Sequence, residues 1–380
     1  MRKKVILPLT IFTVIFIGIN LFLGIQGWKY IDSIFSYNPP SFLKPIYWVA
    51  FWFFTFSYIL SRVFKNALSR NAFRFLHKIG AYWIAVFYYA LLLVLAADIV
   101  ASILKRVTNF SERGITITLG TFVVLLIVIV ISKSRWNALN TKISHYDITI
   151  HKKNEKYEEL FIVLISDLHL STLVTNNRLD WLVNEVNGLS PDLVLIAGDI
   201  IDEDITPFVE EKMTETLKKL RPKLGTFAVP GNHDYYGGHL HHLADHLKEA
   251  NVNFLLDEFQ LVDESFYIIG RKDLASKHRL EVEQILEEID LTKPLILLDH
   301  QPLKLEVPTN LGIDLQVSGH THRGQFMPNH FITRKIFELD WGYLKKENSH
   351  FIVSSGFGTW GPPIRSGNNS EIVTINVKFD

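Results

Sequence analysis

The sequence predicts two parts of different structural class, an all-α membrane module of four transmembrane helices followed by an α/β domain. The first part contains four long apolar stretches. After Trp136, short apolar runs alternate with stretches of helical periodicity, the pattern of a layered α/β domain. We expect the membrane module to occupy 1–135, a linker and domain entry 136–158, and the α/β domain 159–380.

The four apolar stretches define the membrane module, because most approach the ~20 residues that a helix needs to cross the hydrocarbon core of a bilayer. They run roughly from Val5 to Leu23, Ile46 to Leu60, Ile79 to Leu104 and Ile115 to Ile131. A cleaved signal peptide is an alternative for the first stretch, whose start is basic, but three further apolar segments follow it. We therefore expect a multi-pass protein of the cell membrane.

The distribution of Lys and Arg predicts the orientation of the module. These residues concentrate at the N-terminus, in the second connection and after the fourth stretch. By the positive-inside rule, the termini and the α/β domain face the cytoplasm, although one missed or extra span would invert this result. Asp98 lies within two turns of Lys105 and Arg106, so a position near the membrane interface is the simpler interpretation. An ion path or a partner site is the alternative.

Composition narrows the range of functions. Formal net charge is +0 at pH 7, which argues against nucleic acid as the main partner, because such binding normally needs a basic face. The chain has no cysteine, so disulfides and thiolate metal sites are excluded.

The α/β domain is predicted to contain strands and helices in alternation. Short runs bounded by turn residues indicate buried strands at Leu160 to Ile165, Leu193 to Ala197, Thr226 to Val229, Phe266 to Ile269, Leu295 to Leu298 and Leu315 to Val317. Helical periodicity is present at Arg178 to Asn187, Val209 to Leu220, His239 to Ala250 and Glu281 to Ile289.

Five of these strands are followed directly by a polar motif. The motifs are Asp167-Leu168-His169, Gly198-Asp199, Gly231-Asn232-His233-Asp234, Asp299-His300 and Gly319-His320-Thr321-His322. In such sheets the carboxyl ends of strands meet at one crevice, which would then hold carboxylate, amide and imidazole donors. Each motif alone is more typical of a structural turn, but so many unpaired polar groups in one crevice favour metal binding. The donors suit a pair of divalent ions that hold a water and a phosphate.

In this order the motifs resemble the calcineurin-like metallophosphoesterases, over roughly Leu160 to Val377. The segments 339–343 and 358–365 resemble the membrane-associated bacterial branch of that family. The resemblance implies a four-layer αββα sandwich and a dinuclear metal-dependent phosphoesterase. It also implies one metal held by Asp167, His169, Asp199 and His322, and another held by Asp199, Asn232, His300 and His320. Manganese, iron or zinc suits such mixed oxygen and nitrogen donors.

The same resemblance implies that His233 faces the substrate and is catalytic, with Asp234 orienting or polarising its ring. A water activated by the two metals would attack phosphorus, and His233 would stabilise the transition state or protonate the departing alkoxide.

Four other features have more than one interpretation. Arg323 stands where many relatives have glycine, and either contacts a substrate phosphate or forms an exposed salt bridge. Arg365 belongs to a Gly- and Pro-rich segment that either walls the pocket, where Arg365 would contact substrate, or is a structural turn. The histidines 239, 241, 242 and 246 indicate a surface helix, with a third metal site as the alternative. The residues 271–273 follow a strand and are candidates for contact with an anionic substrate.

The expected substrate contains phosphate, and the membrane module favours a lipid-linked nucleotide or a phospholipid, because a tether keeps the crevice close to the bilayer. A phosphodiesterase or phosphatase acting on soluble nucleotides or cyclic diesters is the alternative, with the spans as an anchor. A non-catalytic membrane sensor is a third hypothesis, against which the complete ligand set argues. A transporter is disfavoured, because the spans show no convincing substrate path.

Overall fold

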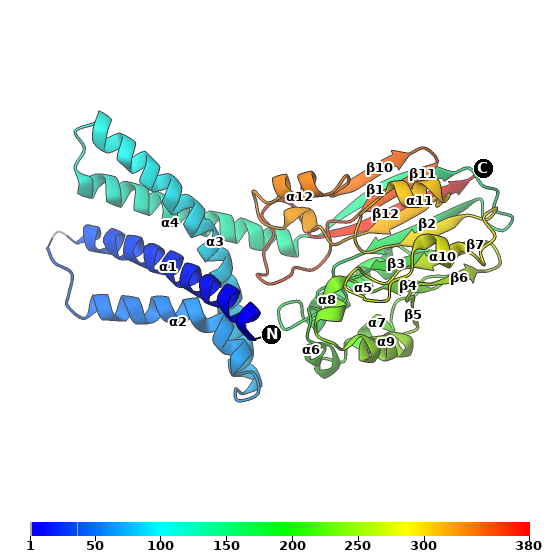
Figure 1. Ribbon diagram of the computed structural model, residues 1–380, viewed down its shortest axis with the longest axis horizontal. Coiled ribbons are helices and arrows are strands. Elements are labelled where there is room, and N and C mark those ends of the chain that lie inside the picture. The colour runs from blue at the N-terminus through cyan, green and yellow to red at the C-terminus, as the bar shows by residue number, and fades with distance from the viewer. Residues whose placement is uncertain (1, 36) are drawn as a thin grey trace. The chain divides into compact units, whose positions relative to one another are not determined.

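The computed structural model describes residues 2–35 and 37–380, with side chains described from residue 10 onward within those ranges. It divides into two compact units, Met1–Lys133 and Ser134–Asp380, both drawn in Figure 1. Each unit has its own fold, and the two are described in turn.

The first unit consists of long helices. They are α1 (Arg2–Ile34), α2 (Leu43–Val63), α3 (Arg70–Val107) and α4 (Glu112–Leu139), the last of which continues into the second unit. All four are long and apolar enough to cross a membrane. The helices extend beyond the predicted apolar stretches, because polar residues continue the helical backbone past the hydrocarbon-length core. The first predicted stretch, Val5 to Leu23, lies within α1, although its residues before Thr10 have no side-chain description.

Close approaches hold the helices of this unit together. A Cβ on Gly80 would overlap the backbone of Tyr58, so only glycine allows α2 and α3 to approach this closely. Asp98 on α3 accepts a 2.7 Å hydrogen bond from Gln26 Nε2 on α1. The structure thus gives the acidic residue of the third span a hydrogen-bond partner inside the module.

The second unit contains two six-stranded sheets. In spatial order, the first is β1 (Lys142–Ile150), β12 (Glu371–Phe379), β2 (Glu159–Ile165), β3 (Leu193–Ala197), β4 (Thr226–Val229) and β5 (Val252–Phe254). The second is β10 (Gly342–Lys346), β11 (Ser349–Val353), β9 (Leu315–Ser318), β8 (Leu295–Leu298), β7 (Phe266–Gly270) and β6 (Glu258–Val262). All six predicted strands are present, and each matches its predicted bounds within about one residue.

Three hydrophobic clusters define the layers of this unit. One fills the space between the sheets, with residues such as Leu164, Ile268 and Ile352. Another packs the outer face of the first sheet against α5 (Asn176–Gly188), α6 (Thr206–Glu210), α7 (Met213–Leu217) and α9 (Leu240–Glu249). The third packs α10 (Val282–Leu286) on the outer face of the second sheet, whose β9 is preceded by α11 (Glu306–Asn310). The four-layer αββα sandwich is confirmed.

Two elements differ from the sequence prediction. The expected helix Val209 to Leu220 is broken into α6 and α7, because Lys212 adopts a left-handed conformation with φ of 54°. The stretch 136–158, expected as linker and domain entry, contains β1, which pairs in parallel with β12 from Lys142 opposite Glu371. Local pattern did not reveal β1 because its partner lies more than two hundred residues away in the chain.

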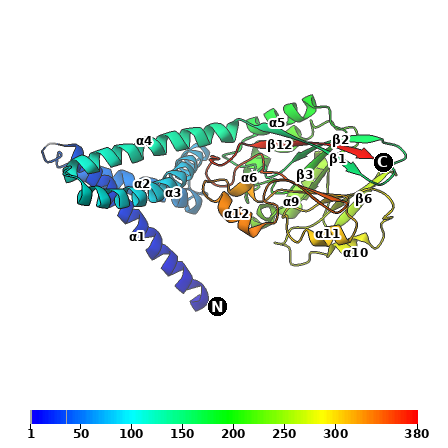
Figure 2. The same cartoon turned by 90° about the horizontal axis from the view of Figure 1, so that it is seen from above.

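Three further short helices lie among the loops that follow strands. They are α8 (Asn232–Tyr236), the 3-10 helix η1 (His322–Gly324) and α12 (His330–Ile336). In both ribbon views α12 lies toward the end of the sheets opposite the C-terminus (Figures 1 and 2). The candidate metal ligands lie near the carboxyl ends of strands, including the strands that precede these helices.

Candidate metal centre

The seven predicted metal ligands lie on loops that leave the carboxyl ends of strands. Asp167 and His169 follow β2, Asp199 follows β3, Asn232 opens α8 after β4, His300 follows β8, and His320 and His322 follow β9. Strands β2, β3 and β4 are parallel neighbours in one sheet, and β8 and β9 are parallel neighbours in the other. Parallel pairing directs these loops to one edge of each sheet, where they meet.

The first group of converging donors contains Asp167, His169 and His322. His169 Nε2 lies 3.0 Å from His322 Nε2, and His322 Nε2 lies 3.1 Å from Asp167 Oδ1. All three side chains are buried. Burial lowers the pKa of His322 to about 4, so its imidazole is neutral at pH 7, the form that binds a metal.

The second group contains Asp199, His300 and His320. His300 Nε2 lies 3.2 Å from Asp199 Oδ2, and His320 Nδ1 lies 2.9 Å from the amide oxygen of Asn232. Asp199 Oδ2 is also 3.7 Å from His169 Nε2 of the first group. Asp199 therefore lies between the two groups, the position that a bridging carboxylate requires.

The protonation of His300 tests whether the site fits a metal. Its Nδ1 lies 2.7 Å from the Ala197 carbonyl oxygen, which can only accept, so this nitrogen carries the hydrogen in the neutral ring. The other nitrogen, Nε2, is buried and has no hydrogen-bond donor or acceptor in suitable geometry. Burial disfavours a charged His300, but the Asp199 carboxylate outweighs burial and raises the pKa of the ring well above its ordinary value. A divalent cation between Nε2 and Asp199 would take the place of that proton, so the donor set fits.

Backbone conformation at the site supports a functional origin. Asp167, His169, Asp199, His320 and His322 have φ values of 53°, 45°, 50°, 71° and 47°. Residues with a Cβ rarely adopt this left-handed region, at a cost of about 1 kcal/mol or more each. A Cβ on Gly231 would also overlap the Asp199 carboxylate. The loops therefore adopt locally unfavourable backbone conformations, and these conformations bring the donor atoms together.

His233 contacts a carboxylate other than the expected one. Its Nδ1 lies 3.1 Å from Asp202 Oδ1, and its ring lies beside the pocket. Asp234 is fully buried, and its carboxylate accepts hydrogen bonds from the backbone N–H groups of Ile201 at 2.9 Å and Gly231 at 2.8 Å. Asp234 therefore holds together the loops that follow β3 and β4. The prediction that Asp234 orients the His233 ring is corrected, because Asp202 is the carboxylate beside that ring.

Asp202 was missed because it follows Asp199 by three residues in what looks like an ordinary turn. It also lies 3.4 Å from His169 Nδ1. Burial disfavours a charged Asp202, but contacts with His169 and His233 outweigh burial and hold its pKa well below the usual range. Burial likewise opposes a charged His233, but Asp202 and Asp199 raise its pKa overall. The spacing Gly-Asp-x-x-Asp after β3 is the signal that could have identified it.

The two arginines predicted as substrate contacts are directed elsewhere. Arg365 is fully buried; Nη1 donates to the Ser355 carbonyl at 2.7 Å, and Nη2 lies 3.2 Å from His322 Nδ1. A side chain behind a ligand and away from solvent does not reach substrate, so Arg365 supports His322 instead. The Arg323 guanidinium lies 4.1 Å from the centre of the Trp341 ring, a cation–π contact.

The other candidate groups have structural partners. Arg271 Nη1 donates to Asp299 at 3.1 Å, and Lys272 lies 3.4 Å from Asp257. Within the described residues, the groups able to hold a metal do not include the histidines 239, 241, 242 and 246, which lie on α9 or just before it. The surface-helix interpretation of this run is therefore favoured over a third metal site.

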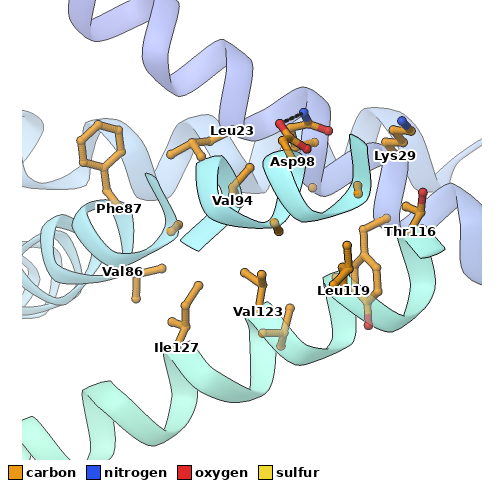
Figure 3. Close-up of a pocket in the computed structure, with 18 of the residues that line it drawn as sticks. Leu23, Lys29, Val86, Phe87, Val94, Asp98, Thr116, Leu119, Val123 and Ile127 are labelled. Carbon is orange, nitrogen blue, oxygen red and sulfur yellow. Dashed lines mark hydrogen bonds between the residues drawn. The ribbon is translucent and has the colours of Figure 1, made fainter. Parts of the chain in front are cut away.

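Four of the seven candidate metal donors border a cavity of about 420 Å³. Its wall contains Asp199, Asn232, His233, His320 and His322, together with Thr321, Gly324, Asn329, Ile332, Thr333, Phe337 and Trp360. Trp360 belongs to the Gly- and Pro-rich segment, which thus forms part of the wall. A larger cavity of about 560 Å³ lies within the membrane module, lined mostly by apolar side chains (Figure 3). Its few polar groups include the Gln26 and Asp98 pair but no described group of metal ligands.

Comparisons with known proteins agree with this geometry. Residues 161–324 match the family described as calcineurin-like phosphoesterase. An uncharacterized metallophosphoesterase of Campylobacter jejuni is 35% identical over 67% of this chain and 68% of its own length. A relative from Aquifex aeolicus is 32% identical over 60% of this chain and 88% of its own length.

A relative from Danio rerio, called a transmembrane protein with metallophosphoesterase domain, is 31% identical over 62% of this chain. The chain spans 57% of the length of that protein, so the match does not extend over the whole of it.

Proposed function

Because this chain belongs to the calcineurin-like metallophosphoesterase family, we propose that it hydrolyses a phosphodiester or pyrophosphate bond in a lipid-linked substrate at the membrane. The observation that carries the reaction type is the close grouping of carboxylate, amide and imidazole donors beside a cavity that His233 also lines. The observation that favours a lipid-linked substrate is the attachment of this domain to four helices long enough to span a bilayer.

The ligand set would divide between two divalent ions, manganese, iron or zinc, and Asp199 would be the carboxylate common to both donor groups. When bound, such a pair lowers the pKa of a shared water and neutralises charge at phosphorus. Asn232 contributes a neutral oxygen, which limits the negative charge of the ligands. Burial disfavours a charged Asp199, but the surrounding imidazoles outweigh it and hold its pKa well below the usual range, so the carboxylate is ionised and ready to bind.

His233 performs the proton chemistry. Its side chain is 17% exposed and borders the cavity, while Asp202 fixes the ring from the other side. A raised pKa keeps a proton on the ring near neutral pH, and this proton can pass to the departing oxygen as the bond to phosphorus breaks. The water supplies the new oxygen on phosphorus, so the products are a phosphate monoester and an alcohol, or two phosphates from a pyrophosphate.

The bias of Lys and Arg supports a cytoplasmic catalytic domain. Placed there, the cavity would meet lipid-linked phosphates of the inner leaflet. Protease treatment of a C-terminal tag tests this orientation. Digestion of the tag only after the cell is opened supports the cytoplasmic orientation, whereas digestion in intact cells contradicts it.

The test of function uses purified full-length protein loaded with manganese in detergent. Its substrates are a chromogenic diester, a panel of lipid-linked pyrophosphates and phospholipids, and soluble cyclic dinucleotides. Selective cleavage of a lipid supports the proposal. Turnover restricted to soluble substrates would make the spans an anchor, and absence of turnover with both metals bound would favour a sensor.

A further inference from the structure

An apolar rim lies beside the metal cavity. It consists of Met327, Phe331, Ile332, Ile336 and Trp360, whose exposed fractions are 47%, 60%, 57%, 62% and 42%. Four of them belong to α12 or the turn before it, and Ile332 and Ile336 occupy one face of that helix because they are four residues apart. Single exposed apolar residues are ordinary, but a cluster of large ones on neighbouring segments indicates an interaction surface.

The rim is continuous with the catalytic cavity. Ile332 and Trp360 line the same cavity as Asn232, His233 and His320. Phe337, which directly follows α12, packs its ring 5.9 Å from the ring of His320. A ligand that reached the metals through this mouth would therefore pass over hydrocarbon side chains on one side.

Basic side chains flank the rim. Arg334 and Lys335 lie on α12 between the two isoleucines, and both are exposed. A short helix with branched aliphatic side chains and adjacent cations is complementary to a molecule that combines a hydrocarbon chain with an anionic head group. A soluble nucleotide offers the charge but not the apolar surface.

The rim belongs to the end of the domain where the chain leaves its last membrane helix. The Arg365 backbone N–H donates to the Ser134 carbonyl at 2.9 Å, and Asn137 Nδ2 donates to the Arg365 carbonyl at 3.0 Å. The segment held in this way carries Trp360, whose carbonyl accepts a 3.0 Å hydrogen bond from Gln325 just before α12. The end of α4 is thus connected to the rim through the segment 360–365 inside the second unit.

We propose that this rim binds the hydrocarbon chain of the substrate while its phosphate occupies the metal cavity. The inference rests on the proposed lipid-linked substrate and specifies where selectivity for the chain arises. Burial of the chain against Ile332, Ile336 and Trp360 supplies binding free energy that grows with chain length, because each additional methylene removes more apolar surface from water.

The test uses full-length enzyme in nanodiscs and a series of alkyl 4-nitrophenyl phosphate diesters, from methyl to octyl. All members share one leaving group and differ only in the chain, so the ratio of kcat/KM for octyl to methyl measures chain recognition. The wild-type ratio is expected to exceed one. In the double variant Ile332→Ser/Ile336→Ser it should fall about tenfold or more. Ile332→Leu/Ile336→Leu should retain it. Leu291→Ser, at a 51% exposed position outside the rim, is the matched control.

The outcomes separate the two proposals. Absence of turnover of every diester by the wild type contradicts the hydrolase function itself. Turnover without preference for longer chains, or a preference that the serine double variant retains, overturns the rim. An equal loss on all chain lengths also overturns it, because the rim would then be covered by another surface of the protein or needed for folding. A lower ratio in the serine variant alone supports the proposal.

Discussion

The membrane module and the α/β domain each contain a sizeable cavity, and the contrast between these two cavities shows what identifies a site. The cavity of the membrane module is the larger, its lining is mostly apolar, and its polar groups include Gln26 and Asp98, which pair with each other. The smaller cavity of the α/β domain is bordered by a carboxylate, an amide and three imidazoles, and several of these residues have left-handed backbone conformations. Donor chemistry, rather than volume, therefore distinguishes the candidate metal centre.

The units also differ in the role of a glycine that allows a close approach. In the membrane module, Gly80 allows two helices to approach. In the α/β domain, Gly231 makes room for the Asp199 carboxylate itself. The same residue type thus serves stability in one unit and the metal site in the other. Substitutions in the two units should accordingly affect different measurements.

Removal of the shared carboxylate should have the largest effect. Asp199→Ala takes away a ligand common to both donor groups, so we expect loss of both metals and at least about a thousandfold lower turnover. Metal content by mass spectrometry and hydrolysis of a chromogenic diester would measure this. A variant that keeps both metals would show that Asp199 does not bridge them.

The second largest effect should distinguish the role of Asp202 from that of Asp234. Asp202→Asn removes the charge beside the ring, so we expect kcat to fall about a hundredfold or more while both metals remain. Asp234→Asn should instead lower the free energy of unfolding by about 1 to 3 kcal/mol, because one of the two oxygens that accept from buried N–H groups is replaced by an NH₂ donor. Thermal melts and steady-state kinetics distinguish them; the reverse pattern would restore Asp234 as the residue that orients His233.

Loss of Arg365 should weaken one metal more than the other. Arg365→Met removes a buried cation beside His322 Nδ1 that acts together with burial to keep the ring unprotonated, so metal affinity is expected to fall about 10- to 100-fold at the site containing His322. Titration of the apoprotein, followed by calorimetry, should resolve one weakened site and one unchanged site. Equal weakening of both would indicate a general collapse of the loops, and Arg323→Met serves as the control arginine.

The smallest effect on catalysis should come from the membrane module. Gly80→Leu forces α2 and α3 apart, which is expected to cost about 1 to 3 kcal/mol in that unit. Turnover of a soluble diester should change less than about twofold, because the metal donors all lie in the other unit. Gly18→Ala is the matched control, since a Cβ there has no neighbour within 4 Å. A large catalytic loss in Gly80→Leu alone would show that the two units are coupled.

The position of the candidate metal ligands at strand ends was predictable from sequence because each motif directly follows a strand whose buried residues are recognisable locally. Asp167, Asp199 and His300 each follow a short apolar run, and parallel strands direct such residues to a common edge. The membrane helices were predictable for a similar reason, because the length of an apolar stretch is itself the signal. In both cases the information lies within a few neighbouring residues.

The contact between His233 and Asp202, the burial of Arg365 and the pairing of β1 with β12 were decided only by the tertiary structure. Each depends on where a loop or strand lies relative to partners distant in the chain. Proximity in sequence favoured Asp234 over Asp202, but the loops turn so that the backbone N–H groups take the Asp234 carboxylate. The sequence by itself determined which chemical groups reach the site; packing decided which of them touch one another, because side-chain direction depends on the whole fold.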